Sequence, residues 1–139
     1  MTLRACVLMV AAVACGQASE PVEQARADVT FVRSPTSGQL MPDSATITLA
    51  GSQIVVAGKM MTGDPCRVIK GALVVTGERI ELTMRSESDG SAGCVAVVAR
   101  FAYTATITGV APGTWEVEVR HLAFGTGGAE IVAASQIIK

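Results

Sequence analysis

The chain has 139 residues, about half of them apolar, and a formal net charge of −1 at pH 7. This length favours a single domain with an apolar core of its own. The eleven basic and twelve acidic side chains are spread along the chain. They form neither the basic block typical of nucleic-acid binding nor an acidic tail. We therefore expect no nucleic-acid partner.

The first fourteen residues have the parts of a signal peptide. Arg4 supplies the positive start, and residues 5–14 form an apolar run. This run is too short to cross a bilayer as a helix but has the length of a signal-peptide core. We expect residues 1–14 to be removed, and we find no later run long enough for a transmembrane helix.

Cys15 follows the apolar run directly, in the sequence A-V-A-C-G. This resembles the lipobox of bacterial lipoproteins: Ala14 matches the small residue before the cysteine, whereas Ala12 stands where leucine is usual. The resemblance implies that Cys15 is lipidated and becomes an acylated N-terminus anchored to a bacterial membrane. Ordinary signal-peptidase cleavage, before Cys15 or before Ser19, remains the alternative. It would yield a secreted or periplasmic soluble protein.

A polar segment follows Cys15 and has no strand pattern. Residues 17–28 read Q-A-S-E-P-V-E-Q-A-R-A-D, a composition typical of a tether. We expect residues 15–28 to form the lipidated cysteine and its tether, and residues 29–139 to form the folded domain.

From Val29 onward, short runs alternate between apolar and polar residues. Turn signals rich in Gly, Pro, Ser and Asp separate the runs. The predicted strands lie near residues 29–31, 45–49, 54–61, 66–76, 80–84, 95–107, 115–119 and 129–139. No convincing amphipathic helix interrupts them. We predict an all-β fold, a single β-sandwich of about seven to eight antiparallel strands, with a small barrel as the alternative.

The strongest alternation lies within residues 94–120. Odd positions from Val95 to Ile107 are apolar, a Pro112-Gly113 turn follows, and Trp115 begins a second alternating run. A period of two places one set of side chains in the core. We predict a β-turn-β unit here, with the aromatic residues between the two sheets: Phe101, Tyr103 and Trp115.

The opposite face of the same unit carries polar side chains. We expect them on two neighbouring strands, as a candidate binding face or as an ordinary solvated surface. The residues are Arg100, Thr104, Glu116, Glu118 and Arg120. Cross-strand pairs of opposite charge stabilise such a face.

Two cysteines remain in the predicted domain, Cys66 and Cys94, since Cys6 leaves with the leader. In an exported chain such a pair favours a disulfide. Two separate buried thiols are the alternative.

The segment 109–119, G-V-A-P-G-T-W-E-V-E-V, resembles a recurrent element of bacterial immunoglobulin-like and transthyretin-like modules. In those modules a Leu precedes Pro-Gly-Thr, an aromatic residue and alternating Val; Val110 and Trp115 take the Leu and aromatic positions here. The cysteine placement also resembles that of small exported bacterial lipoproteins. The resemblance implies an immunoglobulin-like sandwich and no particular activity, because such folds host many functions.

Three groups of residues have side chains that could carry chemistry, and none has the spacing of a known motif. Soft ligands for copper would be Met41, Met60, Met61, Met84 and His121; Asp64, Glu87 and Asp89 would be oxygen ligands for calcium. His121, the sole histidine, lacks a nucleophile-elbow serine nearby. We expect no catalytic residue, no metal and no cofactor.

These observations favour a non-catalytic, lipid-anchored binding or structural module of the bacterial cell envelope. Its partners would be the membrane, through the N-terminal lipid, and an unknown envelope protein or ligand. One alternative is an accessory subunit of an envelope assembly that presents an edge strand. A small metal carrier, or a hydrolase that uses His121, is a further alternative.

Overall fold

The computed structural model describes residues 24–34, 42–122 and 128–139. The predicted signal peptide, Cys15, Met41 and most of the tether lie outside these ranges. Eight strands are described, and their bounds are β1 (Arg26–Ser34), β2 (Ser44–Ala50), β3 (Gln53–Thr62), β4 (Arg67–Thr76), β5 (Arg79–Ser88), β6 (Ala99–Thr108), β7 (Thr114–Leu122) and β8 (Ala129–Ile138). The prediction of an all-β fold is confirmed for this part of the chain, which contains no helix able to cross a membrane.

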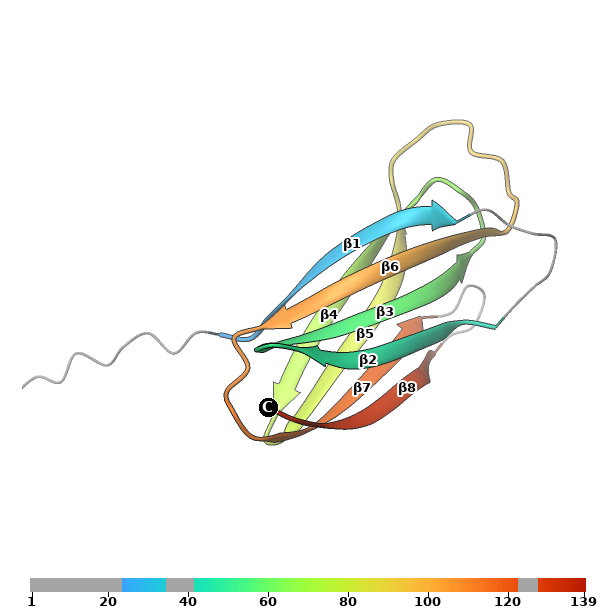
Figure 1. Ribbon diagram of the computed structural model, residues 1–139. Helices are drawn as coiled ribbons and strands as arrows, with labels where there is room; N and C mark the ends of the chain where they lie inside the picture. The colour runs from blue at the N-terminus through green and yellow to red at the C-terminus, as the bar shows by residue number, and fades with distance from the viewer. Residues whose placement is uncertain (1–23, 35–41, 123–127) are drawn as a thin grey trace, which may run out of the picture.

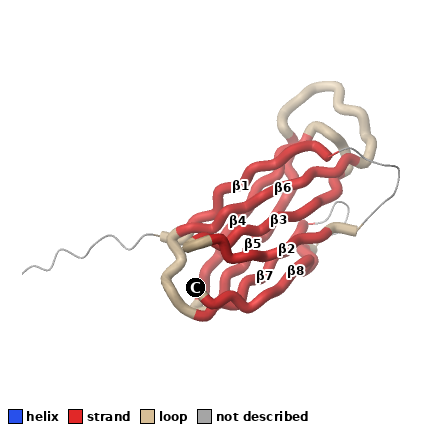
Figure 2. The backbone as a smooth tube through the Cα atoms, in the orientation of Figure 1, coloured by secondary structure: helices blue, strands red, loops and turns tan. Residues whose placement is uncertain are grey.

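The strands form two four-stranded sheets packed face to face (Figures 1 and 2). The first sheet has the order β1-β6-β3-β2, and the second has the order β4-β5-β7-β8. The turn at Gly51 joins β2 to β3, and the turn at Gly77 joins β4 to β5, both as antiparallel hairpins. Both glycines have positive φ, 61° and 58°, a conformation that other residues adopt at a cost. The β-sandwich prediction therefore holds at the level of its two layers.

One strand pair departs from the antiparallel prediction, because β5 and β7 are parallel. The chain leaves β5 at one end of the sandwich, crosses to the first sheet and runs back along it as β6. It then crosses again and enters β7 in the same direction as β5. Along the chain, β6 in the opposite sheet comes between β5 and β7. The two neighbours therefore run in the same direction.

The predicted β-turn-β unit of residues 94–120 is wrong in two respects. First, β6 starts at Ala99, and the valines before it are exposed: Val95 by 67%, Val97 by 49% and Val98 by 48%. Second, β6 and β7 lie in different sheets. The segment between them carries the chain across the end of the sandwich, beginning at Gly109 with a φ of 73°.

The core fills the space between the sheets with one face of each central strand. Its buried apolar residues include Ile54, Val56, Met60, Ile80, Leu82, Met84, Phe101, Tyr103, Ile107, Val117 and Val119. Trp115 is only half-buried and packs against the margin of this cluster. Its indole Nε1 donates to the carbonyl oxygen of Ala111 at 3.0 Å. The need of the indole N–H for an acceptor is consistent with a place at the rim rather than in the apolar centre.

The ordered domain begins earlier than predicted, because β1 starts at Arg26, inside the segment assigned to the tether. Ala27 and Val29 pack against the core, while Arg26 and Asp28 are exposed. The predicted strand begins at Val29, and only Ala27 extends its alternation toward the N-terminus. Antiparallel pairing with β6 continues to Arg26.

Candidate functional site

A buried polar cluster links the two sheets and contains the only histidine of the chain. His121 lies on β7 with its side chain in the core and is 0% exposed. Its Nε2 lies 2.7 Å from the hydroxyl oxygen of Tyr103 on β6. Its Nδ1 lies 3.0 Å from Oδ2 of Asp43, just before β2. The other oxygen of Asp43 accepts the backbone N–H of Met61 at 2.9 Å.

The donors in this cluster follow from its chemistry. With a neutral imidazole and a carboxylate that only accepts, Nδ1–H of His121 donates to Asp43, and Nε2 accepts the hydroxyl proton of Tyr103. Burial and the charge of Asp43 raise the pKa of the Tyr103 phenol well above its ordinary value of 10.0. Tyr103 therefore remains a neutral donor. We call Asp43, Tyr103 and His121 the inter-sheet cluster.

Gly58 gives Tyr103 the room to reach His121. It lies directly opposite Tyr103 in the β3–β6 register. A Cβ atom at this position would lie 2.4 Å from the Cζ and hydroxyl oxygen of Tyr103. The absence of a side chain at Gly58 therefore allows the ring to cross over the strand backbone. Neither Gly58 nor Asp43 was singled out from the sequence, since an isolated Gly in a strand has several common explanations.

The inter-sheet cluster resembles a catalytic triad in connectivity but not in access. A general base must be within reach of a substrate proton, whereas His121 is fully buried and Tyr103 is 3% exposed. Both ring nitrogens of His121 are already engaged. The arrangement is suited to clamping the sheets together, and it does not favour a hydrolase or copper site at His121. Met60 and Met84 are likewise packed into the core.

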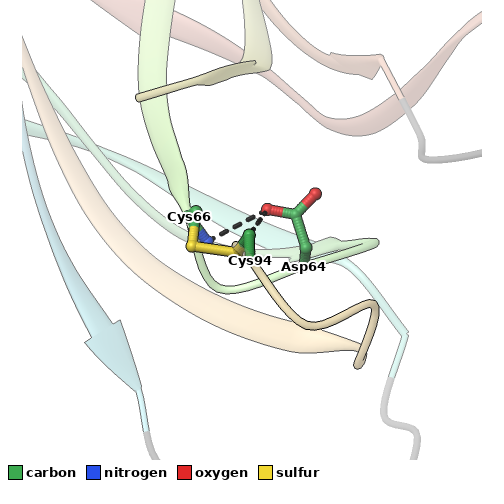
Figure 3. Close-up of side chains that lie close together, drawn as sticks. All are labelled: Asp64, Cys66 and Cys94. Atoms are coloured by element: carbon green, nitrogen blue, oxygen red, sulfur yellow. Dashed lines mark hydrogen bonds between the residues drawn. A yellow bond between two sulfur atoms is a disulfide. The ribbon is translucent and has the colours of Figure 1, made fainter. Parts of the chain in front are cut away.

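The disulfide predicted from the two domain cysteines is present between Cys66 and Cys94 (Figure 3). Asp64 lies beside it: its Oδ1 accepts the backbone N–H of Cys66 at 3.0 Å and lies 3.6 Å from the sulfur of Cys94. Its Oδ2 accepts a hydrogen bond from Nε of Arg67 at 2.7 Å. In the described part of the chain, Asp64 and the two cysteines form the one group with metal-ligand proximity. Zinc and similar ions bind thiolates, and the sulfurs here are bonded to each other.

The acidic residues considered for calcium have other partners. Asp64 pairs with Arg67. Glu87 lies between Lys70 at 2.7 Å and Arg85 at 2.9 Å, and the hydrogen bond from Lys70 is the largest influence that lowers the pKa of its carboxyl group. Asp89 accepts the backbone N–H of Ser91 at 2.7 Å, within its own loop.

The five residues of the predicted binding face lie on two different sheets, so that prediction is wrong. Arg100 and Thr104 are on the outer face of the first sheet, whereas Glu116, Glu118 and Arg120 belong to β7 of the second. The alternation correctly separates these residues from the core-facing set. It cannot indicate which strand lies beside which.

The outer face of the second sheet carries a network of charges. Glu118 is paired with Arg79 of β5 and with Arg120, and Arg120 also lies 3.4 Å from Glu81. Glu118 is 3% exposed because the arginine side chains cover it. Burial alone would raise the pKa of Glu118, but the hydrogen bonds from Arg79 and Arg120 outweigh it and lower the pKa.

The outer face of the first sheet is rich in hydroxyl groups. Thr30, Thr104, Ala57 and Thr46 form one row across the four strands. The two outer faces therefore differ in chemistry, and the shared surface expected from the sequence is replaced by two separate ones.

Among the described residues that lie outside the strands, the large exposed apolar side chains gather at the disulfide end of the sandwich. Val95, Val97 and Val98 follow Cys94 in the long connection between β5 and β6. This connection projects beyond the sheets at the end opposite the entry of the chain at residue 24 (Figure 1).

Comparison of the chain with protein-family models, with curated proteins and with solved structures finds no match.

Proposed function

We propose that this protein is a non-catalytic, lipid-anchored binding module of the bacterial cell envelope, with an immunoglobulin-like sandwich, that contacts a protein partner through its disulfide end. The observation that carries the proposal is the exposed valine segment after Cys94. Contiguous apolar exposure outside a core is typical of interaction sites. Three valines within four residues, each about half exposed or more, form such a segment.

The disulfide supports this role because it limits the freedom of the loop. Cys94 is bonded to Cys66, directly before β4, and Asp89 N–H donates to the carbonyl oxygen of Cys66 at 3.1 Å. A loop ordered before binding loses less entropy when it docks. The connection from β5 to β6 is thus held at its start, at Asp89, and again at Cys94 directly before the valines.

The position of the loop supports a partner away from the anchoring membrane. A chain anchored by a lipid on Cys15 would enter the folded domain at residue 24, at the end where β1 begins. The nine residues of β1 span about 30 Å at the usual rise of a strand. The valine segment therefore lies at the end of the sandwich remote from the chain entry, and a domain standing upright on its lipid would present it away from the membrane.

The side chains that could act in catalysis already have partners within the domain, and this supports a binding role over a catalytic one. His121 is buried and hydrogen-bonded through both nitrogens, and the two domain cysteines are joined to each other. The role of an accessory subunit in a larger envelope assembly agrees with the same features. A metal carrier or a hydrolase using His121 has no comparable support.

The contact is tested by placing a photo-crosslinking residue at Val97 in living cells. The matched control is Val74 on β4, which is exposed by 56%, against 49% for Val97. We expect a discrete adduct with an envelope protein from position 97 and none from position 74. Equal labelling at both positions, or none at either, would contradict a specific contact at this end.

The anchor is tested separately by Cys15→Ser. We expect wild-type protein in the detergent-rich phase of a phase-partition experiment and the variant in the aqueous phase. A wild-type protein that is already in the aqueous phase would show that the lipoprotein interpretation is wrong. It would leave the loop experiment unaffected.

A further inference from the structure

The eight described strands leave four sheet edges, and these edges differ in how they are protected against pairing. In the first sheet the edges are β1 and β2, and in the second they are β4 and β8. Charged side chains on an edge strand oppose its pairing with another chain. β1 carries Arg26, Asp28 and Arg33, and β4 carries Arg67 and Lys70. β2, with the sequence S-A-T-I-T-L-A, carries no ionisable residue.

The outer edge of β2 also lacks other forms of protection within the described residues. β2 pairs with β3 in continuous register, and no other described strand pairs with it. It contains neither proline nor a bulge. Asp43, the nearest acidic residue, is directed inward to His121 and to the backbone of Met61. Its charge therefore does not protect the outer edge of β2 against pairing with another strand.

The neighbouring edge on the same side of the sandwich is similarly open. β8 contacts β2 across the two layers, and its one ionisable residue, Glu130, lies at its beginning. The two charged edge strands, β1 and β4, contact each other on the other side of the sandwich. One side of the sandwich is thus charged along both sheets and the other is almost uncharged.

We propose that β2 is a self-association edge, at which a second copy of this chain pairs antiparallel with β2 about a two-fold axis through Ile47. The sequence of β2 is nearly symmetric about this residue. In that register Ile47 meets Ile47 of the second copy, Ala45 meets Leu49, and Thr46 meets Thr48. Leu49, which is 41% exposed in the single chain, gains an apolar neighbour.

The chemistry of each face agrees with this register. Ala45 and Ile47 pack against the core of the first sheet, so their pairs with the second copy extend that core. Thr46 and Thr48 are exposed on the outer face, where cross-strand threonine pairs are favourable. A two-fold contact of this kind is closed, because each copy uses the same strand. The first sheets of the two copies would join into one continuous sheet.

A strand from a different protein would satisfy the same backbone groups, but it would not need β2 itself to be symmetric. The test therefore uses charge pairs that only a second copy can complete. In Thr46→Lys/Thr48→Lys, each lysine faces a lysine of the second copy. In the matched control Thr46→Lys/Thr48→Glu, each lysine faces a glutamate.

The full chain, purified in detergent, is measured by sedimentation equilibrium at matched detergent density. We expect a dimer for wild type and for the lysine–glutamate variant, and a protein mass halved to the monomer for the lysine–lysine variant. Far-ultraviolet circular dichroism checks that all three remain folded. A monomeric wild type, or a lysine–lysine variant that still dimerises, would overturn the proposal.

A mixing experiment tests the register independently of these charged variants. Thr46→Cys and Thr48→Cys are purified separately, mixed and oxidised. We expect a cross-linked dimer to form several-fold faster in the mixture than in either protein alone, because position 46 faces position 48. Equal rates in the three samples would refute the two-fold register. None of these results depends on the loop contact or on the lipid of Cys15.

Discussion

The most direct test of the inter-sheet cluster is Tyr103→Phe, which removes one hydroxyl group and retains the ring. The lost group lies 2.7 Å from Nε2 of His121, whose side chain is 0% exposed. Water has no ready access, since Tyr103 is itself 3% exposed. Nε2 would therefore stay buried without its donor while Asp43 continues to hold Nδ1–H. A buried polar group left unsatisfied costs about 1–3 kcal/mol, and we expect a loss of this size in the free energy of unfolding.

The assay is urea unfolding followed by the fluorescence of Trp115, the sole tryptophan. The control is Thr104→Val, which removes a hydroxyl group from the exposed face of the same strand. It should change the free energy of unfolding by less than about 0.5 kcal/mol. If Tyr103→Phe is as stable as Thr104→Val, the hydrogen bond to His121 does not contribute to holding the sheets together.

Three further predictions concern packing, the disulfide and pH. Gly58→Ala places a Cβ 2.4 Å from ring atoms of Tyr103 and should destabilise by about 1–3 kcal/mol; an unchanged urea midpoint would contradict this close approach. Replacing Cys66 and Cys94 together by alanine should lower the free energy of unfolding by about 3–4 kcal/mol, the loop entropy that a bond across a sequence separation of 28 removes from the unfolded chain. Thiol counting on the unfolded, unreduced wild-type protein should find neither of these cysteines free. Because folding lowers the pKa of Glu118 from its ordinary value of 4.5, its carboxylate stabilises the fold above that pH and loses this contribution as the pH falls toward the folded-state pKa. The difference in unfolding free energy between wild type and Glu118→Gln should therefore narrow in acid, and a pH-independent difference would argue against the charge network.

The strand content was predictable because its cause is local. The period-two pattern of β5, with Ile80, Leu82 and Met84 on one face, follows from the geometry of an extended backbone. The same reasoning failed at residues 95–98, where apolar side chains alternate but are exposed. Alternation shows that a segment is able to bury one face. Burial also requires a second layer of side chains to pack against, and neither sheet extends over this loop.

The disulfide was predictable for a different reason. With Cys6 assigned to the leader and Cys15 to its boundary, only Cys66 and Cys94 remained in the domain, and an oxidising compartment favours their pairing. No knowledge of the strand order was needed. The neighbouring Asp64, which accepts the backbone N–H of Cys66, has no comparable signal in the sequence.

By itself, then, the sequence determined which segments are strands, which side chains of most strands face the core and which two cysteines pair. Only the tertiary structure decided that β6 and β7 lie in different sheets and that β5 and β7 are parallel. It also brought Asp43 to His121 across 78 positions of the chain, and Tyr103 to the same ring. The physical reason is that side-chain alternation is set by each strand's own backbone, whereas the neighbours of a strand are set by how the two layers close over a common core.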